Sequence, residues 1–144
     1  MGEAQPRRRV LILCTGNSCR SQMAEGWVRH ELGDRWEVAS AGTQPAWAVH
    51  PLSVRAMAEV GIDISAARPK HWAPFLDQRW DLVVTVCDSA RESCPLFPGA
   101  VEQIHVSFPD PILAEGSEEE RLAAYRAVRD DIRARLLPEI ARRG

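Results

Sequence analysis

The hydrophobic and polar positions of this chain fall into two kinds of segment. Short uninterrupted apolar runs, such as residues 10–13 and 82–84, are typical of strands buried on both faces of a sheet. Between them, apolar residues recur every three or four positions, which is the period of a helix with one buried side. Because strands that alternate with helices pair in parallel, the pattern predicts an α/β fold.

The boundaries follow from turn and capping residues. Strands are expected at 10–14, 36–41, 81–86 and 101–106, and helices at 21–32, 51–60 and from 117 onward. Ser117 begins a capping box, and Pro138 is expected to end or kink the last helix. Right-handed crossovers favour a doubly wound, four-stranded parallel sheet of order 2-1-3-4 with helices on both faces. Since there are no repeats or linkers, residues 1–144 are predicted to form one domain.

The first apolar run leads directly into Cys-Thr-Gly-Asn-Ser-Cys-Arg-Ser at 14–21. In a loop of small residues between a strand and a helix, backbone N–H groups can turn inward and hold an anion, and the helix dipole adds to this. Arg20 fits two oxygens of a tetrahedral oxyanion, while Gly16 and Asn17 tolerate a positive φ. We therefore predict an oxyanion site made of Thr15, Gly16, Asn17, Ser18, Cys19 and Arg20.

Cys14 lies at the start of this loop, where the inward N–H groups and the helix dipole would also stabilise a thiolate. It is therefore predicted to be a nucleophile, with Ser21 donating a hydrogen bond to its sulfur. A cysteine at a strand end is more often a small buried apolar residue. The spacing of Cys14 from Arg20 and Ser21 favours catalysis here, whereas the thiol of Cys19 is assigned to structure or to a bystander role in the chemistry.

Composition narrows the class of protein. A chain of 144 residues with 45% hydrophobic and 26% charged residues is typical of one soluble globular domain. A net charge of −2 gives no reason to expect nucleic acid or an anionic membrane as a partner, and no apolar stretch reaches membrane-spanning length. We expect a cytoplasmic monomer, because the chain has neither a signal-peptide core nor an additional apolar stripe.

Cys87 and Cys94 form a second candidate site. The cysteine spacing fits no common zinc site, so we expect no metal and favour nucleophilic or redox chemistry. If residues 87–94 are helical, these two cysteines lie about 10 Å apart along the axis, but a disulfide needs Cα atoms within about 7 Å. They can bond only if the helix unwinds. With Cys14 expected at the same sheet edge, we favour a redox switch over two buried cysteines that never meet.

Asp110 is held between two prolines after the predicted fourth strand. Taken alone, this segment is a common turn signal. Its place beyond a strand end near Cys14 favours a role as general acid that protonates a leaving oxygen.

Together these segments resemble the thioredoxin-coupled arsenate reductases, which share the fold of the low-molecular-weight protein tyrosine phosphatases. The resemblance covers nearly the whole chain and rests on residues 14–26, 40–42, 61–65, 81–87, Cys94 and Asp110–Pro111. The match at 14–26 is highly specific, and the spacing of Cys87 and Cys94 separates reductase from phosphatase.

The resemblance implies a mechanism. Arsenate binds in the loop, Cys14 attacks arsenic, and Asp110 protonates the departing hydroxide. Cys87 then attacks Cys14 and arsenite leaves, after which Cys94 takes over the disulfide from Cys14 and thioredoxin reduces the Cys87–Cys94 bond. The resemblance further implies no bound cofactor, with thioredoxin as the external reductant and phosphate or sulfate as competing oxyanions.

One departure from the family concerns a potassium ion that some relatives bind through groups matching Asn17, Glu25 and Ser40 plus a further carboxylate. Here Lys70 falls near the position of that carboxylate. We hypothesise that its ammonium pairs with Glu25 and replaces the ion; a solvent-facing lysine is the alternative.

Two other functions remain open. A phosphomonoesterase of the tyrosine phosphatase type would use the same loop, although Ile112 and Leu113 stand where that branch typically carries tyrosines. A non-enzymatic thiol sensor or arsenite-binding protein would need the cysteines but neither Arg20 nor Asp110.

Overall fold

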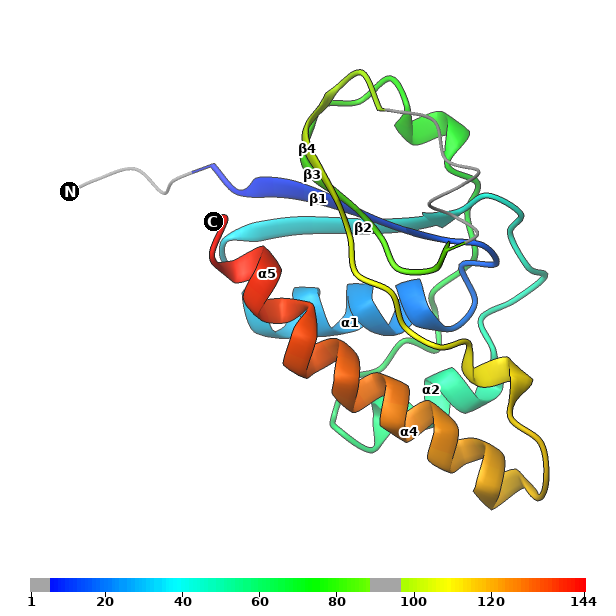
Figure 1. Cartoon of the computed structure of the whole chain (residues 1–144). Coiled ribbons are helices and arrows are strands. Elements are labelled where there is room, and N and C mark those ends of the chain that lie inside the picture. The colour runs from blue at the N-terminus through cyan, green and yellow to red at the C-terminus, as the bar shows by residue number, and fades with distance from the viewer. Residues whose placement is uncertain (1–5, 89–96) are drawn as a thin grey trace.

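A parallel sheet with helices packed on one side forms the frame of the molecule (Figure 1). The computed structural model describes residues 6–88 and 97–144. Its four strands are β1 (Arg8–Cys14), β2 (Trp36–Gly42), β3 (Trp80–Thr85) and β4 (Ala100–His105). They pair in parallel in the order β2-β1-β3-β4, which confirms the predicted strand order.

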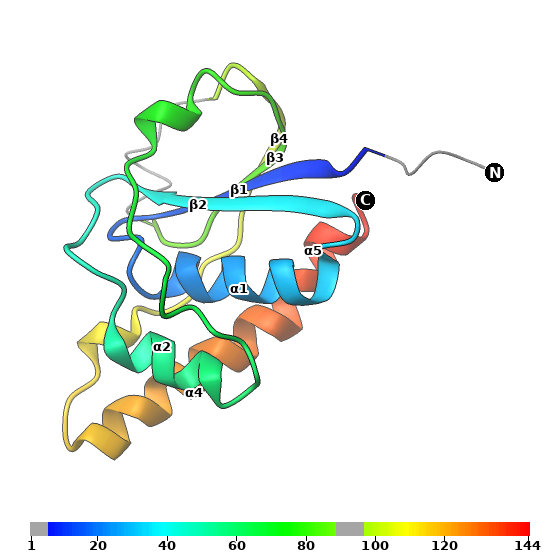
Figure 2. The same ribbon diagram turned by 180° about the vertical axis from the view of Figure 1, so that it is seen from behind.

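Within residues 6–88 and 97–144, the α-helices are α1 (Arg20–Leu32), α2 (Pro51–Ala58), α4 (Glu118–Arg135) and α5 (Leu137–Ala141). All four lie on the same side of the sheet, with α2 packed on α1 and α4 (Figure 2). Within the described residues, the expectation of α-helices on both faces is therefore not met. The capping box of Ser117 and Glu120 is present at the start of α4, and the chain bends at Leu136 into α5, which has Pro138 in its first turn. The predicted effects of the capping box and of Pro138 are therefore confirmed.

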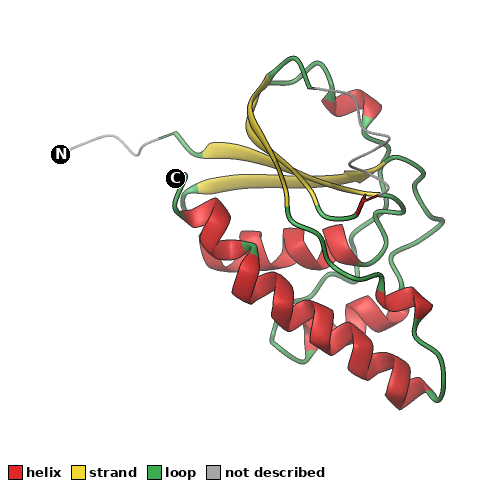
Figure 3. Ribbon diagram, in the orientation of Figure 1, coloured by secondary structure: helices red, strands yellow, loops and turns green. Residues whose placement is uncertain are grey.

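Alternation along β1 divides the core into two layers. Val10, Ile12 and Cys14 face the helices, whereas Leu11 and Leu13 face the opposite side. On that opposite side, among the described residues, the sheet is covered by the segment around the 3-10 turn η1 (Ala73–Phe75) and by Phe97. This turn is visible beyond the sheet in Figure 3. The helix predicted after Cys87, together with Cys94, lies outside the described residues.

The second helix ends as its sequence predicts. Gly61 has φ +81°, and the N–H of Ile62 donates to the carbonyl of Met57, which closes the turn after α2. In the part of the chain that the structure describes, no helix is both long and apolar enough to cross a membrane.

Candidate active site

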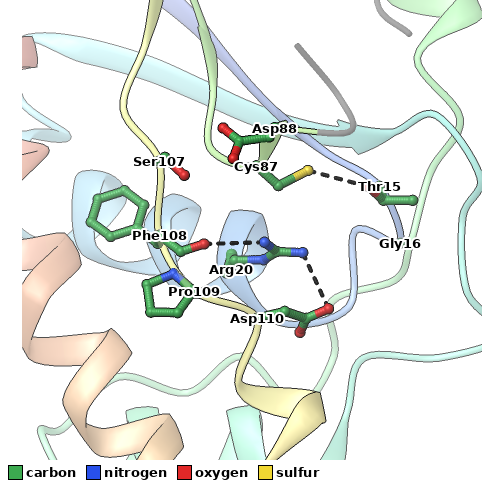
Figure 4. Close-up of a pocket in the computed structure, with 9 residues that line it drawn as sticks. All are labelled: Thr15, Gly16, Arg20, Cys87, Asp88, Ser107, Phe108, Pro109 and Asp110. Carbon is green, nitrogen blue, oxygen red and sulfur yellow. Dashed lines mark hydrogen bonds and ion pairs between the residues drawn. The ribbon is translucent and has the colours of Figure 1, made fainter. Parts of the chain in front are cut away.

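The carboxyl ends of β1 and β3 and the loop after β4 meet at one edge of the sheet (Figure 4). Cys14 ends β1, Cys87 follows β3, and Asp110 lies beyond β4, next to the start of α1 at Arg20. A cavity of about 660 Å³ opens here and is lined by Thr15, Gly16, Arg20, Cys87, Asp88 and Ser107–Asp110. The sequence-based expectation that these segments meet is confirmed.

The loop at residues 15–19 is held in shape by backbone hydrogen bonds from the segment that follows β2. The carbonyls of Cys14, Thr15, Gly16 and Ser18 accept backbone hydrogen bonds from the N–H groups of Thr43, Gln44, Ala46 and His50. Because these carbonyls turn outward, the arrangement favours inward-facing N–H groups, which is the requirement for an anion cradle. One of them, the N–H of Asn17, donates to Cys14 Sγ over 3.3 Å.

Two backbone positions make this close packing possible. A Cβ on Gly42 would lie 2.5 Å from the carbonyl oxygen of Thr15, so only glycine fits against the loop there. Asn17 takes the left-handed conformation with φ +50°, while Gly16 does not. The expected positive φ is therefore confirmed for Asn17 alone.

Cys14 is buried, with its sulfur 3.0 Å from Ser21 Oγ, the contact expected from the sequence. Ser21 Oγ in turn accepts a hydrogen bond from Asn17 Nδ2. With its lone pairs partly engaged by Asn17, the Ser21 hydroxyl is oriented to donate to Cys14. Cys14 also lines a small cavity of about 120 Å³ that adjoins the larger one through Gly16, Arg20 and Asp110.

Asn17 is the centre of a buried polar network beneath the loop. Its Nδ2 also donates to Ser40 Oγ, which donates to Glu25 Oε1 over 2.7 Å. Its Oδ1 accepts from Gln22 Nε2 and from the N–H of Lys70. Every polar atom of the Asn17 side chain is thus held, which fixes the loop from within.

Glu25 lies at the far end of this network and has two cationic partners. Lys70 Nζ is 3.9 Å from Glu25 Oε1, and Arg29 Nη2 is 2.8 Å from Glu25 Oε2. The pairing of Lys70 with Glu25 hypothesised from the sequence is present, but Arg29 is the nearer partner. The i,i+4 spacing of Glu25 and Arg29 on α1 is the signal that would have identified it. Because two cations already balance this carboxylate, the residues do not form a site suited to a further monovalent cation.

Arg20 and Asp110 face each other across the cavity. Arg20 Nη1 donates to the carbonyl of Phe108, and Nη2 lies 3.3 Å from Asp110 Oδ2. The other oxygen of Asp110 accepts from the N–H of Ile112, so the carboxylate is held in a fixed orientation. Arg20 Nε is buried with no hydrogen-bond partner among the described residues. A buried donor without a partner is costly, and a bound oxyanion would satisfy it.

The thiol group of a cysteine after β3 belongs to the larger cavity as well. Cys87 is buried, and its Sγ lies 3.2 Å from Thr15 Oγ1, a side-chain contact that the sequence did not predict (Figure 4). This contact places the sulfur of Cys87 against the residue that follows Cys14. Two thiols and an oxyanion-binding loop are therefore brought together.

Cys19 differs from these two thiols in its surroundings. Its Sγ contacts the hydroxyl of Tyr125 at 3.7 Å, and burial raises the pKa of the Cys19 thiol and that of the Tyr125 phenol. Both groups therefore stay protonated at neutral pH. This environment is consistent with the structural assignment of Cys19.

Most of the predicted site residues lie together at this edge: Thr15, Gly16, Asn17, Ser18, Cys19, Arg20, Cys14, Ser21, Cys87 and Asp110. Cys94 lies outside the described residues. Within residues 6–88 and 97–144, no group of three or more His, Cys, Asp or Glu side chains is arranged to hold a metal ion.

This fold and loop define a family. Residues 9–141 match the low molecular weight phosphotyrosine protein phosphatases, and the chain belongs to that family. Within it, the chain is 50% identical over 127 residues to the arsenate reductase of Halalkalibacterium halodurans, covering 88% of this chain and 91% of that relative.

Solved structures show the same similarity. An arsenate reductase in an oxidized state matches with a TM-score of 0.81 at 28% identity, covering 95% of this chain and 99% of that one. A thioredoxin-dependent arsenate reductase from Corynebacterium glutamicum matches with a TM-score of 0.68 at 30% identity, covering 96% of this chain and 64% of that one.

Proposed function

We propose that this chain is an arsenate reductase that works by a relay of three cysteines and is regenerated by thioredoxin. The observation that carries the proposal is the position of the second thiol, since Cys87 Sγ lies 3.2 Å from Thr15 Oγ1 in the loop that begins at Cys14. Hydrolysis of a phosphate ester needs one thiol, whereas reduction of an oxyanion needs a second thiol that can reach the first. The names of the relatives support the same reaction.

In the first step, arsenate occupies the loop with its oxygens bound by the backbone N–H groups and the guanidinium of Arg20. The Cys14 thiolate, held by Ser21 and the N–H of Asn17, attacks arsenic and forms an S–As bond. One oxygen leaves as water, with a proton supplied by Asp110. Binding of the oxyanion draws Arg20 away from Asp110, which frees the carboxyl group for this role.

In the second step, the thiolate of Cys87 attacks the sulfur of Cys14. The S–As bond breaks and its electron pair stays on arsenic, which is thereby reduced from the +5 to the +3 state and leaves as arsenite. The two sulfurs lose two electrons between them and form the Cys14–Cys87 disulfide.

In the third step, the Cys94 thiolate attacks Cys87, which releases Cys14 as a thiolate and leaves a Cys87–Cys94 disulfide. The dithiol of thioredoxin then reduces this bond. The relative from Corynebacterium glutamicum, which is named thioredoxin-dependent, supports this choice of reductant. The scheme needs no bound cofactor, and it fits a monomer in the reducing cytoplasm.

The proposal is tested by following NADPH oxidation with arsenate, thioredoxin and thioredoxin reductase. The wild type is expected to oxidise NADPH continuously, whereas Cys94→Ser forms about one equivalent of arsenite from its own thiols and sustains no NADPH oxidation, because its Cys14–Cys87 disulfide is not passed on. Hydrolysis of an aryl phosphate by the same Cys94→Ser preparation is the control, because that reaction needs only the Cys14 loop.

A different result would favour the second candidate function. Membership in a phosphatase family supports phosphomonoesterase activity at the same loop, because phosphate and arsenate have nearly the same shape and charge. If arsenate gives no turnover while an aryl phosphate is cleaved, and Cys94→Ser changes neither rate, the chain is a phosphatase. For a reductase, only weak phosphate ester hydrolysis is expected.

A further inference from the structure

A chain of three polar side chains, Thr85, His105 and Asp88, leads from the ends of β3 and β4 to the cavity wall, of which Asp88 is a part. Thr85 and His105 are register partners at the ends of β3 and β4, and Thr85 Oγ1 lies 2.7 Å from His105 Nδ1. His105 Nε2 lies 2.9 Å from Oδ1 of Asp88, the residue after Cys87. None of these three side chains has a step in the relay.

The direction of these hydrogen bonds follows from the chemistry of the groups. An ionised carboxylate only accepts, so His105 Nε2 carries a proton and donates to Asp88. The Thr85 hydroxyl can donate to Nδ1 of a neutral ring or accept from a charged one. Thr85 therefore holds the ring of His105 in place in both of its charge states.

The pairing of Asp88 with His105 matters because the cavity wall carries charges of both signs. Among the described residues, Arg20, Asp88 and Asp110 line the cavity, so this part of its wall carries one cation and two carboxylates. Asp110 is paired with Arg20, while Asp88 is paired with His105 on β4. In Figure 4 the carboxylate of Asp88 and the sulfur of Cys87 extend in opposite directions. A carboxylate that turned toward the loop would repel an oxyanion with two negative charges.

We propose that His105 is a positioning residue that holds the carboxylate of Asp88 against β4 and away from the path of the oxyanion. This inference rests on the proposed function insofar as the cavity binds a tetrahedral oxyanion. His105 touches neither the substrate nor the reacting sulfurs. It acts through Asp88, and its effect is therefore on oxyanion affinity.

The test measures the dissociation constant of inorganic phosphate by calorimetry at fixed pH and ionic strength. His105→Asn keeps a polar atom near the position of Nδ1 but cannot reach Asp88, and it is expected to weaken phosphate binding about three- to tenfold. His105→Gln places a donor near the position of Nε2 and is expected to bind phosphate within about twofold of the wild type.

The decisive variant combines His105→Asn with Asp88→Asn. If the damage comes from a released carboxylate, removing its charge restores phosphate binding to within about twofold of Asp88→Asn alone. Equal weakening in the double variant and in His105→Asn would mean that His105 only supports the fold, which overturns the inference. Unchanged phosphate binding in His105→Asn overturns it as well.

The same measurement separates this inference from the proposed function. If the wild type binds phosphate but does not reduce arsenate, the reductase proposal is refuted. The phosphate affinities of the His105 and Asp88 variants then still test the role of His105. A wild type that binds no phosphate refutes both.

Discussion

Asn17 shows how much of the site depends on a single side chain. Its φ of +50° forms the turn of the loop, while its amide contacts Ser21, Ser40, Gln22 and the backbone of Lys70. The sequence predicted the backbone role, because asparagine tolerates this conformation better than most residues. The family resemblance grouped Asn17 with Ser40 and Glu25, but no local pattern predicted the contact with the backbone of Lys70, which lies 53 positions away.

Lys70 provides a test at the same scale. Its ammonium and Arg29 both face Glu25, so we expect activity in potassium to equal activity in sodium at matched ionic strength. Lys70→Met removes the charge, weakens the balance at Glu25, and is expected to lower the melting temperature by a few degrees. Lys70→Arg keeps the charge and serves as the matched control.

The test measures initial rates of the wild type in potassium and in sodium, and the melting temperatures of the wild type, Lys70→Met and Lys70→Arg. A wild type clearly activated by potassium over sodium would show that Lys70 does not take the place of the ion. A Lys70→Met protein that melts like the wild type would show that the pair contributes nothing.

At the scale of elements, the loop depends on β2 as much as on its own sequence. Gly42 ends β2 and lies so close to the loop that a methyl group there would meet the Thr15 carbonyl at 2.5 Å and the Asn17 nitrogen at 3.1 Å. The segment after Gly42 then binds four carbonyls of the loop region. The glycine that ends this strand is thus required by packing rather than by its own turn.

Gly42→Ala is expected to destabilise the protein by about 1–3 kcal/mol, because the backbone atoms that it meets can move only by distorting the loop. Gly16→Ala is the matched control. It adds the same methyl group within the loop, where the nearest atoms lie at an ordinary 3.8 Å. Urea denaturation of both variants measures the effect, and equal losses in the two would contradict the steric explanation.

At the scale of the whole molecule, an ionic cluster joins the end of α2 to α4. Glu59, just after α2, accepts from Arg126 at 2.7 Å and from Arg129 at 2.9 Å, both on α4. The hydrogen bond from Arg126, with that of Arg129 adding, lowers the pKa of Glu59 to about 2. The ionised form of Glu59 is therefore favoured in the folded state.

This shift predicts a pH dependence of stability. Because the folded pKa is lower than the usual value, the stabilisation is fully present above about pH 4.5 and is lost as the pH falls toward 2. Glu59→Gln is expected to lower the urea midpoint at pH 7, and its difference from the wild type should shrink through that window. Glu115→Gln, at an exposed position before α4, is the control, and a difference that stays constant with pH would contradict the assignment.

The fold was predictable to the level of strand order. The apolar run of 10–13 and the helical period after it indicate elements whose type depends on local sequence, and parallel crossovers are right-handed, which limits their arrangement. The segments that cover the two faces of the sheet were not predictable in the same way. In the described part of the chain, the 3-10 turn around Ala73–Phe75 covers the face of the sheet opposite the helices, and such a short turn has no periodic signal.

The sequence by itself determined the α/β fold, the oxyanion loop and the residues that meet at the carboxyl edge, because these follow from periodicity and from motifs of neighbouring residues. Only the tertiary structure decided which distant groups touch: Cys87 with Thr15, and Asp88 with His105. Those contacts depend on strand register, rotamers and the close approach of backbones. They bring together residues 72 and 17 positions apart, for which no local pattern in the sequence predicts a contact.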